Sequence, residues 1–355
     1  MNRLLRTIVP FVALSFAAWA CSEKDSPPIS DAAIADATTD AEPVPNTDVT
    51  LDPPNPGFQL EVPAFDVPQG SEVQDCYFMA VPENTLHPGE PLYIDRFTIR
   101  QNPGTHHMNV FRVGTVKDLG GHDGDVVRGD AARKNPCWKS ANWSDWPLVV
   151  NSQASTGDGM VDWQLPDGVA QKFEPGELLM LQTHYVNAST QHSALGRGKV
   201  LVNFHQIEAD AVQHEMGTLF ATNQNIRICP GETKEFTKTC NFAKSEPLHI
   251  IAANGHFHSR GTDFRAYSYD AVNDQRGEMF YESLVWDDPP MARDLDVTVP
   301  PMGGIEYSCG FHAEADDCGN ADDECCYTFG GSVDTQEHCN LFLYYYPKQV
   351  DFGCF

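Results

Sequence analysis

The sequence predicts an all-β protein built from two consecutive jelly-roll-like β-sandwich domains. Short runs of strand-forming residues recur between clusters of Gly, Pro, Asn and Asp, as at residues 178–185, 199–207, 248–253 and 341–346. No amphipathic helical pattern longer than three turns is present. The globular part, roughly 300 residues, exceeds what one sandwich usually holds, so we expect two domains.

The N-terminus has the pattern of a signal peptide, which we place at residues 1–20. An apolar run begins near Arg3 and Arg6 and ends in Ala-Trp-Ala, directly before Cys21. Small residues at −3 and −1 suit a signal peptidase, and a cysteine at +1 suits lipid attachment. We therefore predict lipidation of Cys21, with plain Ala-x-Ala cleavage and a free secreted protein as the alternative.

Residues 21–57 are predicted to be a disordered, acidic, Pro-rich tether. Between residues 22 and 56 the chain has eight acidic residues, seven prolines and no aromatic residue. Such a stretch cannot bury enough apolar surface to offset its ordering entropy. The N-terminal domain is then expected at residues 58–207 and the C-terminal domain at residues 208–355.

The net charge of −27 excludes a protein that follows the phosphates of a nucleic acid, because such a protein needs a basic face. The cysteine count points to an exported chain. Eleven cysteines are present, and ten remain when Cys21 is set aside, an even number that suits disulfides in an oxidising compartment. A thiolate metal site is the competing interpretation, but the sequence has no pair of C-x-x-C knuckles to support it.

The histidines supply candidate metal ligands. His256 and His258 lie at i and i+2, so on a strand their imidazoles point to the same face and can bind one metal. Adjacent residues face opposite ways, so His106 and His107 can reach one metal only at a strand end or a bulge. His184 lies near the end of a predicted strand. A surface or turn location is the alternative for each of these histidines.

Four separated motifs, taken in order, resemble the copper type II, ascorbate-dependent monooxygenases, the family of peptidylglycine α-hydroxylating monooxygenase and dopamine β-monooxygenase. The motifs are GTHHM at 104–108, LQTHY at 181–185, HFH at 256–258 and EHCNLFLYYY at 337–346. The resemblance extends over nearly all of residues 58–355.

The resemblance implies two jelly-roll domains, each holding one copper, that face each other across a solvent-filled cleft. The first, electron-supplying copper is expected at His106, His107 and His184. The second, oxygen-activating copper is expected at His256, His258 and a third ligand, with these three residues as the catalytic set. The family has Met at the third position, and this chain has His338. Imidazole also suits Cu(II) and Zn, whereas thioether sulfur favours Cu(I).

The resemblance further implies the disulfides Cys309–Cys339 and Cys240–Cys354, and Cys76–Cys137 is expected in the first domain. The remaining four cysteines, Cys229, Cys318, Cys325 and Cys326, have no family counterpart and cannot be paired from the sequence. Peptide-amidating members bind a carboxylate through an Arg and a Tyr; the matching residues here are Asn254 and Phe342. Without the guanidinium, we expect a neutral or cationic substrate, aromatic ones included.

The sequence therefore predicts an exported copper enzyme that hydroxylates an activated C–H bond of a small organic substrate. It would use molecular oxygen, two copper ions and ascorbate or a similar one-electron donor. It would be a membrane-anchored lipoprotein, facing the periplasm or on the cell surface, or a secreted protein without lipidation. The alternatives are a non-catalytic copper-binding lipoprotein and a zinc-dependent hydrolase on the same scaffold. The substrate, the reductant and the oligomeric state stay open.

Overall fold

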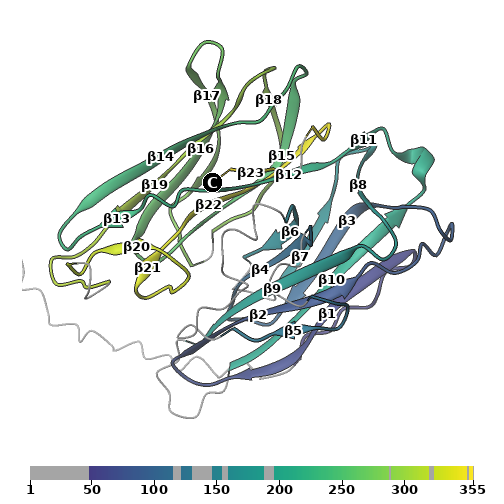
Figure 1. Cartoon of the computed structure of the whole chain (residues 1–355), viewed down its shortest axis with the longest axis horizontal. Coiled ribbons are helices and arrows are strands. Elements are labelled where there is room, and N and C mark those ends of the chain that lie inside the picture. Colours follow the sequence, from purple (N-terminus) through teal and green to yellow (C-terminus); the bar gives the residue numbers. More distant parts are fainter. Residues whose placement is uncertain are drawn as a thin grey trace, which may run out of the picture. The chain divides into compact units, whose positions relative to one another are not determined.

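The computed structural model describes residues 48–114, 121–129, 146–153, 159–187, 196–287, 289–319, 324–349 and 352–354. Pro45–Phe355 forms one compact unit. In its described part the strands form five sheets, grouped into an N-lobe and a C-lobe (Figure 1), and the one helical element is the short 3-10 helix η2 (Ala209–Ala211). The prediction of an all-β fold is confirmed.

The N-lobe is a sandwich of two sheets. Its outer sheet follows the order β1 (Gly57–Val67), β10 (Gly196–Ile207), β3 (Leu92–Gln101), β8 (Val169–Phe173) and β11 (His214–Glu215), with β7 (Met160–Gln164) also paired to β3. Its inner sheet follows the order β5 (Val126–Val127), β2 (Ser71–Ala80), β9 (Leu178–Asn187), β4 (Thr105–Arg112) and β6 (Leu148–Ser152). The inner sheet presents the N-lobe histidines.

The C-lobe has two larger sheets and one small sheet. Its inner sheet follows the order β18 (Ala292–Val299), β15 (Leu248–Phe257), β22 (Cys339–Tyr346), β12 (Gly217–Thr222) and β23 (Phe352–Cys354). Its outer sheet follows the order β14 (Thr233–Asn241), β19 (Gly304–His312), β16 (Gly261–Asp270) and β17 (Gln275–Ser283). The small sheet joins β13 (Arg227–Ile228), β20 (Tyr327–Phe329) and β21 (Gln336–Glu337).

Strand β22 shows why the predicted strand at 341–346 is apolar throughout. Leu341 and Leu343 belong to the core of the C-lobe. Phe342 and Tyr344 point the other way and join the core of the N-lobe. Because successive side chains of a strand face opposite sides, both faces of β22 are buried, and no polar alternation is needed.

The two lobes are held together by apolar packing and by hydrogen bonds. Trp163 of the N-lobe meets the ring of Tyr344 edge to face, with centroids 4.8 Å apart. The backbone N–H of Asn151 donates to the Tyr344 hydroxyl at 2.8 Å. The hydroxyl of Thr218, in β12, donates to the carbonyl of Leu148, in β6, at 2.5 Å. The inner sheets of the two lobes therefore face each other and form a packed, hydrogen-bonded interface.

The predicted tether is too long at its C-terminal end. Residues 48–56 contact the outer N-lobe sheet, and β1 begins at Gly57. Arg197 of β10 forms an ion pair with Asp48, with Nε and Oδ1 2.6 Å apart. Asn203 donates to the carbonyl of Asp52 at 2.8 Å. Polar partners on the neighbouring strand thus order a segment whose own composition offers few apolar contacts.

The boundary between the lobes falls slightly later than residue 208. Strand β11 (His214–Glu215) still pairs with β8 of the N-lobe, whereas β12, which begins at Gly217, belongs to the C-lobe. The predicted signal peptide at 1–20, Cys21 and most of the tether lie outside the described residues.

Four disulfides join described cysteines: Cys229–Cys326, Cys240–Cys354, Cys309–Cys339 and Cys318–Cys325. The second and third of these are the pairs that the family resemblance implied, and the other two join the cysteines that the sequence could not pair. Cys76 is disulfide-bonded, but its expected partner, Cys137, lies outside the described residues. The disulfides indicate an exported chain in an oxidising environment. No helix within the described ranges is both long and apolar enough to span a membrane.

Candidate metal centre

Three histidines of the N-lobe converge on the face of its inner sheet. His107 of β4 and His184 of β9 are paired directly across the two strands, and a bulge between Thr105 and His107 turns His106 out of the regular alternation. All three imidazoles thereby lie together, with ring centroids 5.0 to 5.3 Å apart. The bulge is the irregularity that two adjacent histidines need in order to bind one metal ion.

Gly104 allows the chain to enter this bulge. Its φ of +89° lies in the left-handed region that side chains disfavour. A Cβ atom at this position would also lie 2.5 Å from the hydroxyl of Tyr185. Glycine is therefore required immediately before the segment that presents His106 and His107.

Three histidines of the C-lobe form a second group. His256 lies near the end of β15, His258 follows that strand, and His338 immediately precedes β22. The ring centroids of His258 and His338 are 4.4 Å apart, and each of these rings lies 5.2 Å or less from the ring of His256. The i, i+2 spacing and the strand pairing of β15 with β22 bring the three rings together.

The two groups meet in one cluster of six histidines, here called the six-histidine cluster. The ring centroid of His256 lies 4.9 Å from those of both His106 and His107. In the described residues, His106 forms a compact ligand group with His107 and His184, and a second one with His256 and His258. His338 lies beside the second group but outside this compact set. The structure thus differs from the expected solvent-filled cleft, because the packed lobe interface brings the two sites together.

The cluster is buried, and burial disfavours the charged form of five of its imidazoles. All six side chains are at most 7% exposed. Burial, reinforced by neighbouring imidazoles, holds the pKa values of His106, His107, His256 and His338 well below the usual imidazole value. Burial likewise lowers the pKa of His258 to about 4. A neutral imidazole retains the lone pair that binds a metal.

Hydrogen bonds orient three of these histidines, and at His256 and His258 they leave the other ring nitrogen available to bind a metal ion. Nε2 of His184 donates to the carboxylate of Glu72 at 2.8 Å. Nδ1 of His258 donates to the carbonyl of Gln336 at 3.0 Å, because that carbonyl can only accept. These bonds orient both rings, and Nε2 of His258 remains available to bind a metal ion.

A similar argument fixes the ring of His256, through Gln153 of the N-lobe. The amide nitrogen of Gln153 donates to the carbonyl of Gly255 at 3.0 Å, which fixes the orientation of the amide. Its oxygen therefore faces Nδ1 of His256, 2.7 Å away, and accepts that proton. The lone pair of His256 then resides on Nε2.

The donor set fits a metal ion. Five buried ring nitrogens have no hydrogen-bond partner: Nε2 of His106, His256 and His258, and Nδ1 of His107 and His338. An unsatisfied buried polar atom costs about 1–3 kcal/mol. Their convergence on one cluster is explained if metal ions are bound there, and imidazole suits copper and zinc.

Glu337 holds the turn after β15 in place. It is fully buried, and its two carboxylate oxygens accept the backbone N–H groups of His258 and Arg260 at 3.0 and 2.9 Å. Burial raises the pKa of this carboxyl to about 8. Glu337 thus ties the segment that carries His258 to the strand that leads into His338.

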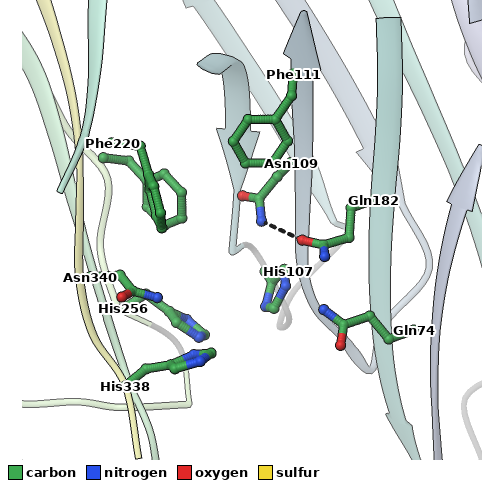
Figure 2. Close-up of a pocket in the computed structure, with 10 residues that line it drawn as sticks. Gln74, His107, Asn109, Phe111, Gln182, Phe220, His256, His338 and Asn340 are labelled. Carbon is green, nitrogen blue, oxygen red and sulfur yellow. Dashed lines mark hydrogen bonds between the residues drawn. The ribbon is translucent and has the colours of Figure 1, made fainter. Parts of the chain in front are cut away.

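A small cavity separates the two inner sheets beside the cluster (Figure 2). Its volume is about 20 Å³, room for a single water molecule. Carboxamides and phenylalanines line it together with three of the histidines; the lining residues are Gln74, His107, Asn109, Phe111, Gln182, Phe220, His256, His338, Asn340 and Phe342. No Lys, Arg, Asp or Glu is among them.

The sequence predicts all six histidines of the cluster but not the residues that orient them. Glu72 and Gln153 carry no local motif, and their contacts span 112 and 103 residues. Gln182 stands inside the LQTHY motif, two residues before His184, and that spacing places both side chains on one face of β9. Period 2 could therefore have identified Gln182, but not Gln153.

Comparisons with known proteins assign no family. No family model matches the chain, and no curated protein matches it. The VP2 subviral particle of infectious bursal disease virus is 11% identical with a TM-score of 0.21, over 84% of this chain and 73% of that chain. The PBCV-1 virus capsid is 8% identical with a TM-score of 0.24, over 84% and 95%. Likenesses this weak carry no argument about function.

Proposed function

We propose that this protein is a copper- and oxygen-dependent monooxygenase that hydroxylates an activated C–H bond of a small organic substrate. The observation that carries the proposal is the six-histidine cluster: six buried imidazoles that converge from both lobes, with five ring nitrogens that have no hydrogen-bond partner. The order of the four histidine-containing motifs, which resembles the copper type II, ascorbate-dependent monooxygenases, supports copper over other metals.

The histidines would hold two copper ions, one mainly at His106, His107 and His184 and the other at His256, His258 and His338. Bound copper supplies reversible one-electron transfer and the activation of molecular oxygen, with ascorbate or a similar one-electron donor as reductant. The protein's own contribution is to set the ligand geometry. Glu72, Gln153 and the carbonyl of Gln336 fix the rings of His184, His256 and His258.

The surroundings of the cavity support a neutral substrate. Besides the ring nitrogens of the histidines, the unpartnered atoms that line it include three carboxamide atoms, Oδ1 of Asn109, Nε2 of Gln182 and Oδ1 of Asn340. They can donate to and accept from a neutral polar group. Phe111, Phe220 and Phe342 exclude water and suit an apolar or aromatic portion of the substrate. A carboxylate would find no cationic partner there.

Ascorbate-dependent oxygen uptake, measured together with copper content, tests the proposal. The protein loaded with copper should consume oxygen in the presence of ascorbate and a panel of neutral substrates. His184→Ala should lose one of two copper equivalents and most of the oxygen uptake, because one of the two metal positions loses a ligand. His122→Ala is the matched control, since His122 has a side chain that is 86% exposed and lies outside the cluster. Copper-loaded protein without ascorbate-dependent oxygen uptake would contradict the proposal.

Two other functions each have one supporting observation. The all-imidazole donor set, with His338 in place of the family's Met, also suits a zinc-dependent hydrolase. The small size of the cavity also suits a copper-binding protein without catalysis. Metal content after purification without added metal separates the two: zinc supports the hydrolase, and copper without oxygen uptake supports the binding protein.

We further propose that the exported chain is anchored through a lipid on Cys21. The support is the pattern of small residues before this cysteine at the end of the predicted signal peptide. Cys21→Ser should move the protein from the membrane fraction to the soluble fraction. An unchanged distribution, or a mature N-terminus without a lipid in mass spectrometry, would exclude lipidation.

A further inference from the structure

We infer that Glu72 is a positioning residue whose charge gives the N-lobe histidines a stronger preference for oxidised copper than the C-lobe histidines have. Glu72 acts through the ring of His184. The N-lobe group is His106, His107 and His184, and the C-lobe group is His256, His258 and His338. The inference rests on the copper binding of the proposed function, and it concerns what sets the balance between Cu(II) and Cu(I) at each group.

Strand pairing places Glu72 beside His184. Strands β2 and β9 are antiparallel neighbours, and Gln74 lies directly opposite His184. Glu72 lies two residues before Gln74 and therefore on the same face of β2. Its long side chain reaches the diagonal neighbour, and Nε2 of His184 donates to its Oε2 at 2.8 Å. A carboxylate that accepts from a ligand histidine orients the ring and raises its basicity.

This carboxylate and imidazole pair is more buried than the other such pairs in the described ranges. The side chain of His184 is 1% exposed and that of Glu72 is 19% exposed. By contrast, the side chains of His87 and Glu208, which form a similar pair on the surface, are 50% and 54% exposed. Solvent and salt screen a buried pair much less than a surface pair. The charge of Glu72 therefore acts on His184 and on an ion bound to its ring.

The C-lobe group has neutral partners at the corresponding places. Nδ1 of His256 donates to the amide oxygen of Gln153 at 2.7 Å. Nδ1 of His258 donates to the backbone carbonyl of Gln336 at 3.0 Å. Both partners orient a ring, as Glu72 does, but neither adds a charge to it. Orientation is thus common to the two groups, whereas a charged partner distinguishes the N-lobe group.

Glu337 is the carboxyl group next to the C-lobe histidines, and it contacts backbone rather than a ring. Its oxygens accept the backbone N–H groups of His258 and Arg260 at 3.0 and 2.9 Å. Its role is to hold the turn. Among the described residues, Glu72 is therefore the carboxylate that is hydrogen-bonded to an imidazole of the six-histidine cluster.

The charge of Glu72 favours the more highly charged ion at the N-lobe group. Cu(II) has one more positive charge than Cu(I), so a nearby carboxylate stabilises Cu(II) more. A more basic imidazole acts in the same direction. Glu72 thereby lowers the reduction potential at the N-lobe group relative to the C-lobe group. The difference favours the passage of one electron between the groups, with Cu(I) oxidised to Cu(II) at the N-lobe group and Cu(II) reduced to Cu(I) at the C-lobe group.

A redox titration of the copper-loaded protein, without oxygen or substrate, tests the inference. The Cu(II) signal in electron paramagnetic resonance should disappear in two one-electron steps, and His184→Ala should retain only the step at higher potential. Glu72→Gln should raise the lower potential by about 59 mV, a tenfold shift in the ratio of Cu(II) to Cu(I), and leave the higher one unchanged. Glutamine keeps an acceptor oxygen for His184 but has no charge. Equal potentials in the wild type, or wild-type potentials in Glu72→Gln, would overturn the inference.

Two further variants separate charge from orientation and from the net charge of the protein. Glu72→Leu should also weaken copper binding at the N-lobe group by roughly 10–100-fold, because His184 loses its acceptor as well. Glu61→Gln is the matched control, since Glu61 lies in the outer sheet of the N-lobe, has a side chain that is 51% exposed and pairs with Lys199 at 3.1 Å. It should leave both potentials unchanged. A shift in Glu61→Gln equal to that in Glu72→Gln would refute an action through His184.

Oxygen uptake by the same copper-loaded samples keeps this inference distinct from the proposed function. A potential that responds to Glu72→Gln, in a protein without ascorbate-dependent oxygen uptake, would refute the monooxygenase and support the role of Glu72. Oxygen uptake by a protein whose potentials do not respond to Glu72→Gln would support the monooxygenase and refute the role of Glu72.

Discussion

His338 is the residue whose chemistry most distinguishes this chain from the family it resembles. Its ring lies 4.4 Å from that of His258, and its buried Nδ1 has no hydrogen-bond partner. We expect His338→Met to retain a metal at this position and to bind Cu(I) better relative to Cu(II), because thioether sulfur is a softer ligand than imidazole. X-ray absorption of the reduced variant should show a copper–sulfur shell. The same shell in the reduced wild type would mean that another Met is the ligand.

At the scale of residues, the sequence could predict ligands but not the groups that orient them. The i, i+2 spacing of His256 and His258 predicts a shared face, and the adjacent pair His106 and His107 predicts a strand end or a bulge; the structure has both features. Both predictions depend only on local backbone geometry. The contact of Gln153 with His256 depends on how the lobes dock, which no short-range pattern encodes.

Among the structural elements, strands β19 and β22 are joined by the disulfide Cys309–Cys339. The bridge begins at the residue after His338, so it anchors the strand that presents that imidazole. Replacing both cysteines by Ala should lower the free energy of unfolding by about 4 kcal/mol, because the loop entropy of a 30-residue closure returns to the unfolded chain. Denaturant unfolding of the metal-free protein measures this loss.

The bridge Cys318–Cys325 supplies the matched control. It closes only 7 residues, so its removal by the same double replacement should cost about 2 kcal/mol and leave copper binding unchanged. Removal of Cys309–Cys339 should in addition weaken copper binding at the C-lobe position. Equal effects of the two double variants on copper affinity would show that the Cys309–Cys339 bridge does not support the ligand strand.

Each of the four predicted strands lies within one strand of the structure. In order, 178–185 lies in β9, 199–207 in β10, 248–253 in β15 and 341–346 in β22. Each is longer than predicted, because polar residues at its ends pair with neighbouring strands; β15 continues through Asn254 to Phe257 by pairing with β22. Hydrophobic pattern locates a strand, whereas its ends depend on partners that are distant in sequence. The same limit explains why residues 48–56 were predicted to be part of a tether.

For the whole molecule, metal removal should loosen the contact between the lobes. Ligands from both lobes converge on one cluster, so bound metal adds stability only while the lobes are together. At a free metal concentration 1,000 times the Kd, one site contributes about 4 kcal/mol. Chelation should therefore lower the Tm in scanning calorimetry, and added copper should restore it. An unchanged Tm after complete removal of metal would contradict ligation across the interface.

The packing of the whole molecule also limits which substrate groups the site can bind. Asn254, where amidating enzymes have an Arg, is 1% exposed and already engaged: its Oδ1 accepts from Asn151, and its Nδ2 donates to the carbonyl of Pro290 at 3.1 Å. Phe342, in place of the Tyr, packs its ring 5.1 Å from that of Phe220. Neither residue can receive a carboxylate. The cavity holds about one water molecule, so the interface must open before a substrate reaches the cluster.

We therefore expect a glycine-extended peptide to be a poor substrate and its methyl ester to be a better one. The two molecules differ by one negative charge at the carboxyl end, and the residues that line the cavity include no cation to offset it. Burying an unpaired carboxylate is costly, whereas an ester can accept a hydrogen bond from Nε2 of Gln182. The test is substrate-dependent oxygen uptake with ascorbate, measured for both molecules at equal concentration, and it should be faster with the ester. Faster uptake with the free acid would require a cation from outside the lining residues to reach the site when the lobes open, and would refute recognition by the carboxamides.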